Sequence, residues 1–462
     1  MIRNFIKKPF TDYNKPGGQK ELLGLALPMI IATACDGIMT FTDRLFLAKV
    51  GSEQMNASLA GGTSIQMLTF FFIGLIGYTT ALSAQYLGAG EKQNSSRTTF
   101  QAIIISLIAW PIIIAFIPFL GILFDWLKTP QSQIIYQQQY VSVLAFGVIF
   151  TLLRHTLSCY FVGIGRTKIV MQATVAAMLT NVVLDYILIF GKLGFQPMGV
   201  TGAALATVSG SVVAVIILLR AYFDKQNLHE YSIAKSFRFS GEIMKKLLYF
   251  GSPAGLELFL NFIAFFFMIA LFQSRGDVES TATTIMFNWD MVSFIPLLGI
   301  EMSVTSLVGK YMGAGRPQVA HRAALSGIKI GIFYSVIILA LFIFIPRALV
   351  LVFKPDIASP VFDSALPVAV QMIQIASLYV LAEAVIVALV GALRGAGDTH
   401  FTMIASVVAH WSFVPVLYLC LHVLNLSVPF SWFVLVVFFL VFSLILVMRF
   451  KSGKWKTIKV VS

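Results

Sequence analysis

The feature of this sequence that most restricts its fold is a series of long apolar segments separated by short polar breaks. A segment of about 20 apolar residues is long enough to cross a bilayer as a helix. In lipid every backbone polar group needs a partner within its own element, which favours helices. We therefore predict an all-α polytopic membrane protein with twelve transmembrane helices, at residues 22–45, 57–87, 99–123, 134–162, 169–190, 199–223, 243–273, 281–311, 325–346, 367–393, 401–424 and 428–448.

The composition excludes a soluble protein of this length. Hydrophobic residues make up 58% of the 462 residues and charged residues only 11%, whereas about 25% are charged in a typical soluble domain. The net charge of +13 would indicate nucleic-acid binding in a soluble domain. Here the basic residues fall in short breaks between apolar segments, so we predict no nucleic-acid partner.

The positions of the basic residues predict how the chain is oriented. With twelve spans both termini face the same side, and 26 of the 33 Lys and Arg residues fall on that side. Because cytoplasmic loops carry an excess of Lys and Arg, we place segments 1–21, 224–242 and 449–462 in the cytoplasm. We expect a multi-pass protein of the inner or plasma membrane. The first twenty residues lack the apolar core and cleavage site of a signal peptide, so no cleavage is expected.

The two halves of the chain repeat. We divide the chain into an N-lobe at 22–223, a linker at 224–242 and a C-lobe at 243–448. Six spans in each half give both copies the same orientation, which is a parallel repeat typical of secondary transporters. One Gly-Ala-Gly match could be only a shared helix C-cap, but the matches form an ordered series. A shift of 225 residues pairs Leu22 with Leu247, Pro28 with Pro253, Gly74 with Gly299, Tyr86 with Tyr311 and Gly88-Ala89-Gly90 with Gly313-Ala314-Gly315; a shift of 232 pairs Gly163 with Gly395.

Acidic residues inside the spans are the first candidates for a functional site. A charge in the bilayer centre costs a few kcal/mol and usually faces a cavity or a partner. We find no Lys or Arg at a comparable depth, and unpaired carboxylates can exchange protons or bind Na⁺ together with other oxygens. The alternative for a single acid is a protonated group hydrogen-bonded to a neighbouring helix, which we favour for Asp290 and Glu301. The seven acids are Asp36, Asp43, Asp185, Glu257, Asp290, Glu301 and Glu383.

Spacing along the helices groups some of these acids in the N-lobe. Asp36 and Asp43 are seven residues apart and should project from nearly the same helix face. Asn181 and Asp185 are four apart and share a face of the fifth span. The two spans could bring these side chains to one coordination site.

The C-lobe has a different arrangement of acids. Glu257 and Asn261 are four residues apart in the seventh span, and Glu383 lies in the tenth. Under the shift of 225, Asn261 corresponds to Asp36, whereas Met268 corresponds to Asp43. We therefore expect the N-lobe to bind the coupling ion more strongly.

The sequence resembles the multidrug and toxic compound extrusion (MATE) transporters of the multidrug/oligosaccharidyl-lipid/polysaccharide flippase superfamily. The resemblance extends from Leu22 to about Arg449. It implies twelve helices in two V-shaped lobes, alternating access, and export of cationic amphiphiles driven by inward Na⁺ or H⁺. The motifs that carry it are FTDRLFLAKVG (41–51), YLGAGEK, YMGAGRP, FVGIGRTK (161–168), TNVVLDYILIFG (180–191), GVTGAALATV (199–208) and VGALRGAGDT (390–399).

The resemblance also assigns site residues. The first-span acid of the family falls on Asp43 and its fifth-span Asn-x-x-x-Asp on Asn181 and Asp185, so this N-lobe set is the candidate Na⁺ site. Thr207 and Tyr140 resemble the hydroxyl groups around it. This N-lobe pattern is DinF-like.

The C-lobe is only partly NorM-like. The position that carries an acid in the seventh span of the NorM-like branch is Asn261 here. Glu257, one turn earlier, is the candidate substitute, and Glu383 matches the tenth-span acid. Asp290 and Glu301 complete the C-lobe candidates.

The predicted activity is antiport rather than catalysis. We expect cationic drugs or dyes to leave in exchange for Na⁺ or H⁺, by a monomer without a cofactor. The six histidines lack metal or triad spacing; for mid-span His410 we favour packing over proton relay. The alternative is a lipid or lipid-linked oligosaccharide flippase, whose anionic headgroup would call for basic cavity residues. The all-acidic mid-span charges argue against it, while Na⁺ and H⁺ stay undistinguished.

Overall fold

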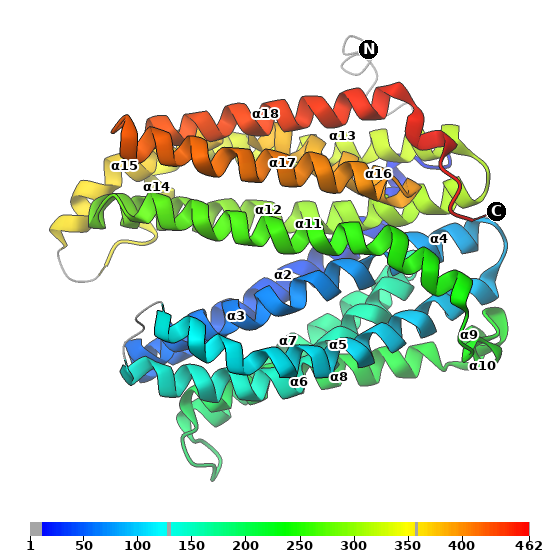
Figure 1. The fold of residues 1–462 in the computed structure, drawn as a ribbon, viewed down its shortest axis with the longest axis horizontal. Helices are drawn as coiled ribbons and strands as arrows, with labels where there is room; N and C mark the ends of the chain where they lie inside the picture. The colour runs from blue at the N-terminus through cyan, green and yellow to red at the C-terminus, as the bar shows by residue number, and fades with distance from the viewer. Residues whose placement is uncertain (1–11, 127–130, 356–358, 462) are drawn as a thin grey trace.

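The computed structural model describes residues 12–126, 131–355 and 359–461. Within these ranges the chain folds into helices, without strands. The helices form two bundles that lie one above the other in Figure 1, the N-lobe below and the C-lobe above. This arrangement confirms the predicted fold class.

The N-lobe contains six spans. The second span is α3 followed by α4, with the break at Tyr78. The helices of this lobe are α2 (Gln19–Val50), α3 (Ser52–Gly77), α4 (Thr79–Gly88), α5 (Lys92–Trp126), α6 (Gln131–Gly163), α7 (Thr167–Phe190) and α8 (Gly199–Tyr222).

The linker and the C-lobe follow. Eleven helices in the described ranges are long and apolar enough to cross a membrane, and α15 with α16, bent by 49°, makes the twelfth span. The linker forms α9 (Lys225–Glu230) and α10 (Ile233–Ser236). The C-lobe helices are α11 (Gly241–Gln273), α12 (Asp277–Gly313), α13 (Pro317–Phe344), α14 (Pro346–Leu351), α15 (Pro360–Ala376), α16 (Val380–Ala396), α17 (Thr399–Tyr418), which continues as a π-helix (Leu419–Val423), α18 (Val428–Ser452) and a short 3₁₀ helix (Lys454–Thr457).

Polar caps and glycines mark the helix ends that the polar breaks predicted. Ser240 caps α11 by accepting from the Ile243 N–H, and Ser427 caps α18 by accepting from the Phe430 N–H. Gly191 ends α7 with a φ of 67°, a left-handed conformation that suits glycine.

The lobes meet where helices of one cross helices of the other at glycines. α3 packs on α11, and a Cβ added to Gly255 would lie 2.4 Å from the Phe71 carbonyl oxygen. α12 packs on α2, and a Cβ on Gly299 would lie 2.6 Å from the Ile30 nitrogen. Beyond these crossings Thr33 Oγ1 donates to the Ile295 carbonyl at 3.3 Å. Glycine is needed at both crossings because any larger residue would push the lobes apart.

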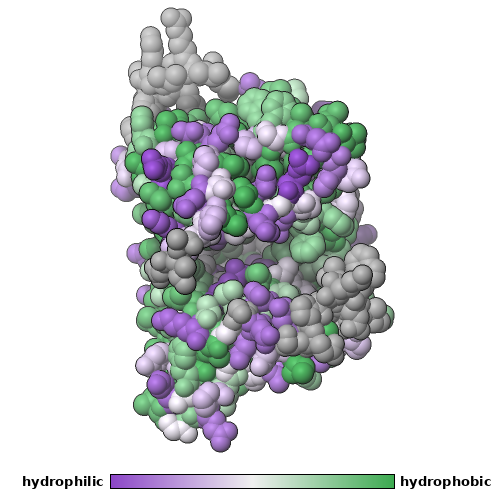
Figure 2. Space-filling model, turned by 90° about the vertical axis from the view of Figure 1, so that its left-hand side faces the viewer, coloured by the Kyte–Doolittle hydropathy of each residue, from purple (hydrophilic) through white to green (hydrophobic). Residues whose placement is uncertain are grey.

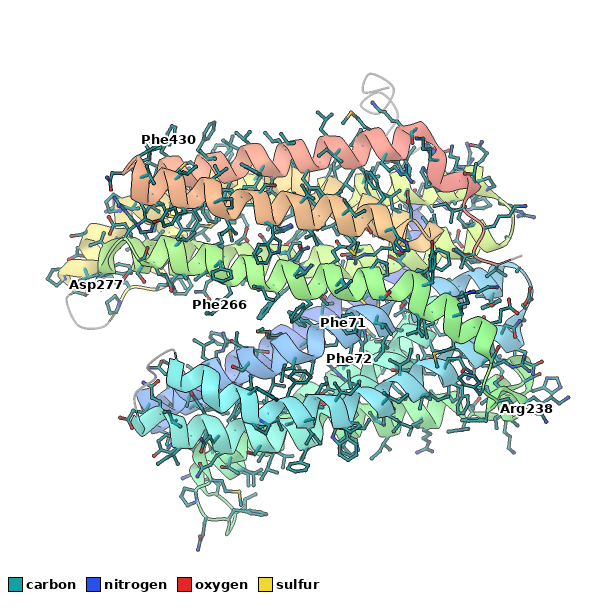
Figure 3. All side chains as sticks on the ribbon, viewed as in Figure 1. Phe71, Phe72, Arg238, Phe266, Asp277 and Phe430 are labelled. Carbon is teal, nitrogen blue, oxygen red and sulfur yellow. The ribbon has the colours of Figure 1, made fainter. Side chains whose placement is uncertain are left out.

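The two ends of the molecule differ. At the end marked by Asp277 in Figure 3 the two bundles diverge, and the space-filling surface is hollowed between them when viewed from this end (Figure 2). We call this the open end. The end marked by Arg238 is where the bundles converge, and we call it the closed end.

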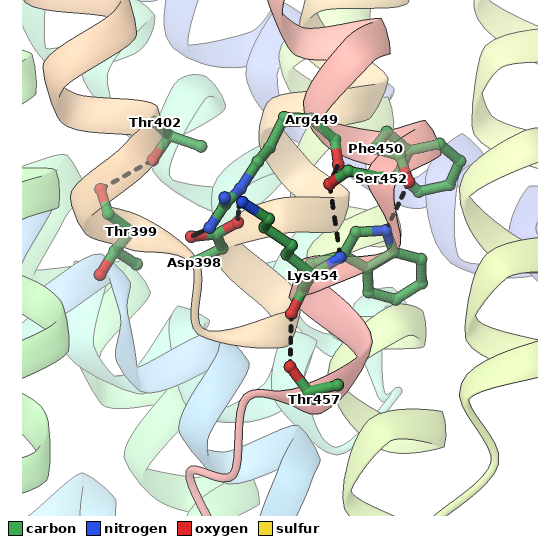
Figure 4. A network of polar contacts seen from close by, with 9 residues as sticks. Asp398, Thr399, Thr402, Arg449, Phe450, Ser452, Lys454 and Thr457 are labelled. Atoms are coloured by element: carbon green, nitrogen blue, oxygen red, sulfur yellow. Dashed lines mark hydrogen bonds and ion pairs between the residues drawn. The ribbon is translucent and has the colours of Figure 1, made fainter.

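The segment after α18 is ordered and contacts both lobes. Arg449 binds Asp398 with two hydrogen bonds of 2.7 and 3.0 Å, and Trp455 Nε1 donates to the Phe450 carbonyl at 2.9 Å (Figure 4). Val460 is only 4% exposed and packs in a hydrophobic cluster made mostly of N-lobe residues, together with Ile243 and Leu247 of α11. The C-terminal segment therefore joins the lobes at the closed end.

Candidate functional site

Three helices of the N-lobe bring polar side chains around Asp43. Asp43 on α2 is 7% exposed. Asn181 on α7 donates from Nδ2 to Asp43 Oδ1 at 3.1 Å, and Thr207 on α8 donates from Oγ1 to Asp43 Oδ2 at 3.0 Å. The sequence predicted that these side chains would meet, and the structure places them together.

Asp185 is the second carboxylate of this group. It is fully buried, and neither of its carboxylate oxygens has a hydrogen-bond donor among the described residues. Its carboxylate interacts electrostatically with that of Asp43. Tyr140 on α6 is also buried and within electrostatic range of both acids. We call these five residues, Asp43, Tyr140, Asn181, Asp185 and Thr207, the N-lobe acid site.

Close helix packing puts α7 and α8 in register for this site. A Cβ on Gly210 would lie 2.9 Å from the Ala177 carbonyl and 3.4 Å from Asn181 Cβ. A Cβ on Gly202 would lie 2.9 Å from the Leu188 carbonyl carbon. These glycines let α8 lie directly against α7, which puts Thr207 beside Asn181.

The chemistry of the N-lobe acid site follows from its charges. Two neighbouring buried carboxylates repel each other unless a proton or a cation lies between them. The Asn181 side-chain oxygen has no partner among the described residues, so it adds a further free acceptor. Carboxylate, amide and hydroxyl oxygens together suit a hard cation such as Na⁺ or a shared proton.

Asp36 does not belong to this site, although its spacing from Asp43 predicted a common face. Seven residues advance a helix by about 10 Å, so a shared face does not bring two side chains to one point. Asp36 is instead hydrogen-bonded and ion-paired to Arg154 of α6, with Arg154 Nη1 at 2.8 Å from Asp36 Oδ1. Its side chain is 44% exposed.

The prediction that no Lys or Arg lies at the depth of the acids is wrong. Besides Arg154, Arg394 of α16 lies between two acids of the C-lobe. Its Nη2 is 3.0 Å from Glu257 Oε2 and its Nη1 is 2.6 Å from Glu301 Oε1. Arg394 lies just past the predicted end of the tenth span at 393, but α16 continues to Ala396. Helix ends are not sharply defined by hydropathy, and a long side chain reaches back to its partners.

This ion pairing changes the interpretation of the C-lobe acids. Glu301 is held by Arg394 and is not the isolated protonated acid that we favoured. Glu257 is also held by Arg394 and does not join Asn261, whose Nδ2 donates to Ser406 Oγ at 2.8 Å. The predicted substitution of Glu257 for the missing acid at Asn261 therefore has no support in the geometry.

Asp290 and Glu383 form the second group of C-lobe acids. The Tyr379 hydroxyl, at the bend between α15 and α16, donates to Asp290 Oδ1. Glu383 is 5% exposed and interacts electrostatically with Asp290. Sequence reasoning missed Tyr379, because a tyrosine at the start of a helix carries no signal of its own.

An apolar cavity of about 80 Å³ adjoins this group. Asp290, Tyr379 and His410 are the polar residues in its lining, together with aromatic side chains. His410 Nδ1 is 2.8 Å from the Ser406 carbonyl oxygen. The wall also includes Trp432, whose indole N–H has no partner among the described residues.

Comparison with known proteins identifies a family. The family model named MatE matches residues 28–187 and 253–419, one match in each lobe. The chain is 28% identical over 401 residues to multidrug resistance protein PmpM of Pseudomonas aeruginosa, covering 85% of this chain and 81% of that protein. It is 25% identical over 464 residues to the NorM protein of Thermotoga maritima, covering 99% and 96%.

Solved structures share the fold. A multidrug resistance MATE family transporter in an outward-facing conformation superposes with a TM-score of 0.86 at 22% identity, covering 94% of this chain and 96% of that one. A transporter of the same superfamily from Pyrococcus furiosus gives a TM-score of 0.86 at 21% identity, covering 94% and 95%. At this identity the likeness concerns the arrangement of the helices.

Proposed function

The chain belongs to the MatE family of transporters, and from that premise we propose that it is a multidrug efflux transporter that exports cationic amphipathic compounds by antiport with Na⁺ or H⁺. Its relatives PmpM and NorM carry the names of multidrug resistance proteins, which supports drugs as the exported compounds. The observation that carries the proposal is the N-lobe acid site, where two buried carboxylates have no ion pair to a cationic side chain among the described residues.

The N-lobe acid site supports coupling in the following way. A proton or Na⁺ entering from the open end binds between Asp43 and Asp185 and removes one of their two negative charges, so a cationic substrate is attracted there less strongly. The same carboxylates attract the substrate once the ion has left. Coupling needs only that ion and substrate each bind the two conformations with different affinity.

A lipid or lipid-linked oligosaccharide flippase is the second candidate. Arg154 and Arg394 favour it more than the sequence indicated, because they are basic residues within the spans. Each guanidinium is already neutralised, however: Arg154 by Asp36, and Arg394 by two acids. Neither therefore offers a surplus positive charge for an anionic pyrophosphate, and cation export stays the better-supported proposal.

We further propose that the protein lies in the inner or plasma membrane with its closed end toward the cytoplasm, and that it is a monomer. The C-terminal segment after α18 and the linker helices α9 and α10 lie at this end (Figure 1), and the Gly17 carbonyl before α2 binds Ser326 there. The polar breaks assigned to this end carry the excess of Lys and Arg. An impermeant thiol reagent applied to intact cells should label Glu53→Cys at the open end. It should spare Gln318→Cys at the closed end; the reverse result would invert the orientation.

Dye efflux from proteoliposomes with independently imposed Na⁺ and pH gradients tests the transport proposal. We expect one of the gradients to drive ethidium export by the wild type. Asp43→Asn should abolish that export, because one neutral amide cannot replace the carboxylate that binds the cation. Asp277→Asn, an exposed acid outside the N-lobe acid site, is the matched control. Export that continues in Asp43→Asn, or that ignores both gradients, would exclude the antiport mechanism.

A further inference from the structure

The closed end contains two contacts between the lobes that are related by the internal repeat. The Tyr311 hydroxyl of α12 donates to Glu21 Oε2 at the start of α2, at 2.8 Å. Lys246 Nζ, near the start of α11, donates to the Tyr86 hydroxyl of α4 at 3.4 Å. The shift of 225 that pairs Tyr86 with Tyr311 also pairs Glu21 with Lys246. Each lobe therefore presents a tyrosine to the first helix of the other lobe. The charges that the two tyrosines meet have opposite signs, so Tyr311 donates and Tyr86 accepts.

A crossing of two helix ends lies beside these tyrosines and follows the same symmetry. A Cβ on Gly88 would lie 1.9 Å from the Lys310 carbonyl oxygen, and a Cβ on Gly313 would lie 1.9 Å from the Gln85 carbonyl oxygen. The shift of 225 exchanges these two contacts as well. The repeated Gly-Ala-Gly segments thus allow α4 and α12 to touch backbone to backbone, and this contact holds the lobes together at the closed end.

The chain that precedes the first helix of each lobe is held by the third span of the other lobe. Ser326 Oγ of α13 donates to the Gly17 carbonyl at 2.9 Å. Gln101 Nε2 of α5 donates to the Arg238 carbonyl at 3.0 Å. Ser326 is the repeat counterpart of Gln101. A third pair of contacts therefore lies at the same end, in which counterpart donors bind carbonyls that the shift of 225 does not pair.

We propose that these contacts form a gate with two latches of opposite charge, Glu21 with Tyr311 and Lys246 with Tyr86, and that both latches must break before the closed end opens. The proposal rests on the alternating access implied by the proposed transport function. A helix crossing without room for a Cβ is closely packed, and packed interfaces favour two discrete states over continuous deformation. The latches then set the balance between the two states.

The two latches differ in strength. The Glu21 carboxylate accepts from the Gly17 N–H at 2.8 Å and from Tyr311 at 2.8 Å, and Lys310 Nζ adds an ion pair at 3.1 Å. Lys246 reaches Tyr86 only at 3.4 Å and is drawn to Glu242 of its own helix at 2.8 Å. Charge-assisted hydrogen bonds of short length are the stronger ones. The Glu21 latch therefore contributes more to closure than the Lys246 latch.

Distances between spin labels on the full-length protein test the gate. One label pair, Lys168→Cys with Gln318→Cys, places an exposed site on each lobe at the closed end, and a second, Glu53→Cys with Asp277→Cys, does so at the open end. The three native cysteines are buried. We expect Tyr311→Phe and Glu21→Ala to lower the ratio of closed to open conformers at the closed end by roughly tenfold. Tyr86→Phe and Lys246→Met should produce a smaller shift.

Glycine variants test the close contact between α4 and α12 separately from the latches. Gly88→Ala and Gly313→Ala should lengthen the closed-end distance most, because no flexible atom can move aside from the new Cβ. Gly24→Ala is the matched control, since nothing lies within 4 Å of the added Cβ on the same helix as Glu21. Glu230→Gln is the charge control. Glu230 lies in the linker, and its partners Lys92 and Arg166 both belong to the N-lobe, so its ion pairs do not join the two lobes.

Unchanged distance distributions in both tyrosine variants, in protein that elutes as a folded monomer, would overturn the latches. A shift of equal size in Glu230→Gln would also overturn them, because the effect would then not depend on contacts between the lobes. The labels report conformation without transport. If dye export fails while the distances still shift, the proposed function fails and the gate stands.

Discussion

The N-lobe and the C-lobe share a helix arrangement but differ in how their buried acids are neutralised. In the N-lobe, Asp43 accepts hydrogen bonds from Asn181 and Thr207 and Asp185 has no donor, and neither acid has an ion pair among the described residues. In the C-lobe, Glu257 and Glu301 share the guanidinium of Arg394. A carboxylate that already holds an arginine has little affinity left for a free cation. The repeat thus preserved the packing of the lobes, while the lobes differ in whether these buried acids have a cationic partner.

The remaining C-lobe acids, Asp290 and Glu383, are an intermediate case. Tyr379 donates to Asp290 but supplies no positive charge. A neutral donor stabilises one carboxylate and leaves the pair short of a cation. At this second group the two lobes therefore differ only in degree, because Asp290 has a neutral donor and no cationic partner.

The largest effect is expected for Asp185→Asn. It removes one of two facing carboxylates, so ion binding and gradient-driven dye export should fall to the background of empty liposomes. Glu301→Gln is the C-lobe match and should retain export, because Arg394 keeps Glu257 as a partner. Initial rates of ethidium efflux measure both variants. Equal loss in the two would show that the lobes contribute alike.

A large loss of stability is expected for Arg394→Met. It leaves Glu257 and Glu301 buried together without a counter-charge, and breaking a buried ion pair in this way costs about 3–5 kcal/mol. Thermal unfolding in detergent should show a clearly lower midpoint. Adding Glu257→Gln and Glu301→Gln to the same chain should restore much of the lost midpoint temperature. An unchanged midpoint in Arg394→Met would contradict the ion pairs of Arg394 with Glu257 and Glu301.

A smaller effect is expected for Tyr379→Phe. The variant removes a hydrogen bond to a carboxylate, which is worth about 1.5–3 kcal/mol, and leaves the ring in place. Both thermal stability and the apparent affinity for the coupling ion should change modestly. If ion affinity falls as far as it does in Asp185→Asn, Asp290 and Glu383 form an ion site equal to that of the N-lobe.

The smallest effect is expected for Arg154→Gln. Asp36, its partner, has a side chain that is 44% exposed, and solvent-exposed ion pairs contribute about 0–1 kcal/mol. Stability should change little, and raising the ionic strength should make the variant and the wild type still more alike. A loss as large as that of Arg394→Met would show that the pair of Asp36 and Arg154 is less hydrated than the exposure of Asp36 indicates.

Most of the fold could be predicted from the sequence because each span is a local pattern. Length and hydropathy identify the helices, and the shift of 225 identifies the repeat. The meeting of Asp43 with Asn181 could be predicted from family motifs. The pairing of Asp36 with Arg154 could not, because a helix face defines a direction and not a position along the axis.

The sequence by itself determined the membrane-spanning class, the duplication and the acids available to each lobe, because these depend on residue type and order. Only the tertiary structure decided which acids meet a cation. It also decided that Gly88 and Gly313 are sites of helix contact and that Glu21 and Lys246 reach tyrosines of the opposite lobe. Electrostatic pairing acts over a few ångströms, and residues hundreds of positions apart come that close only after the lobes have packed.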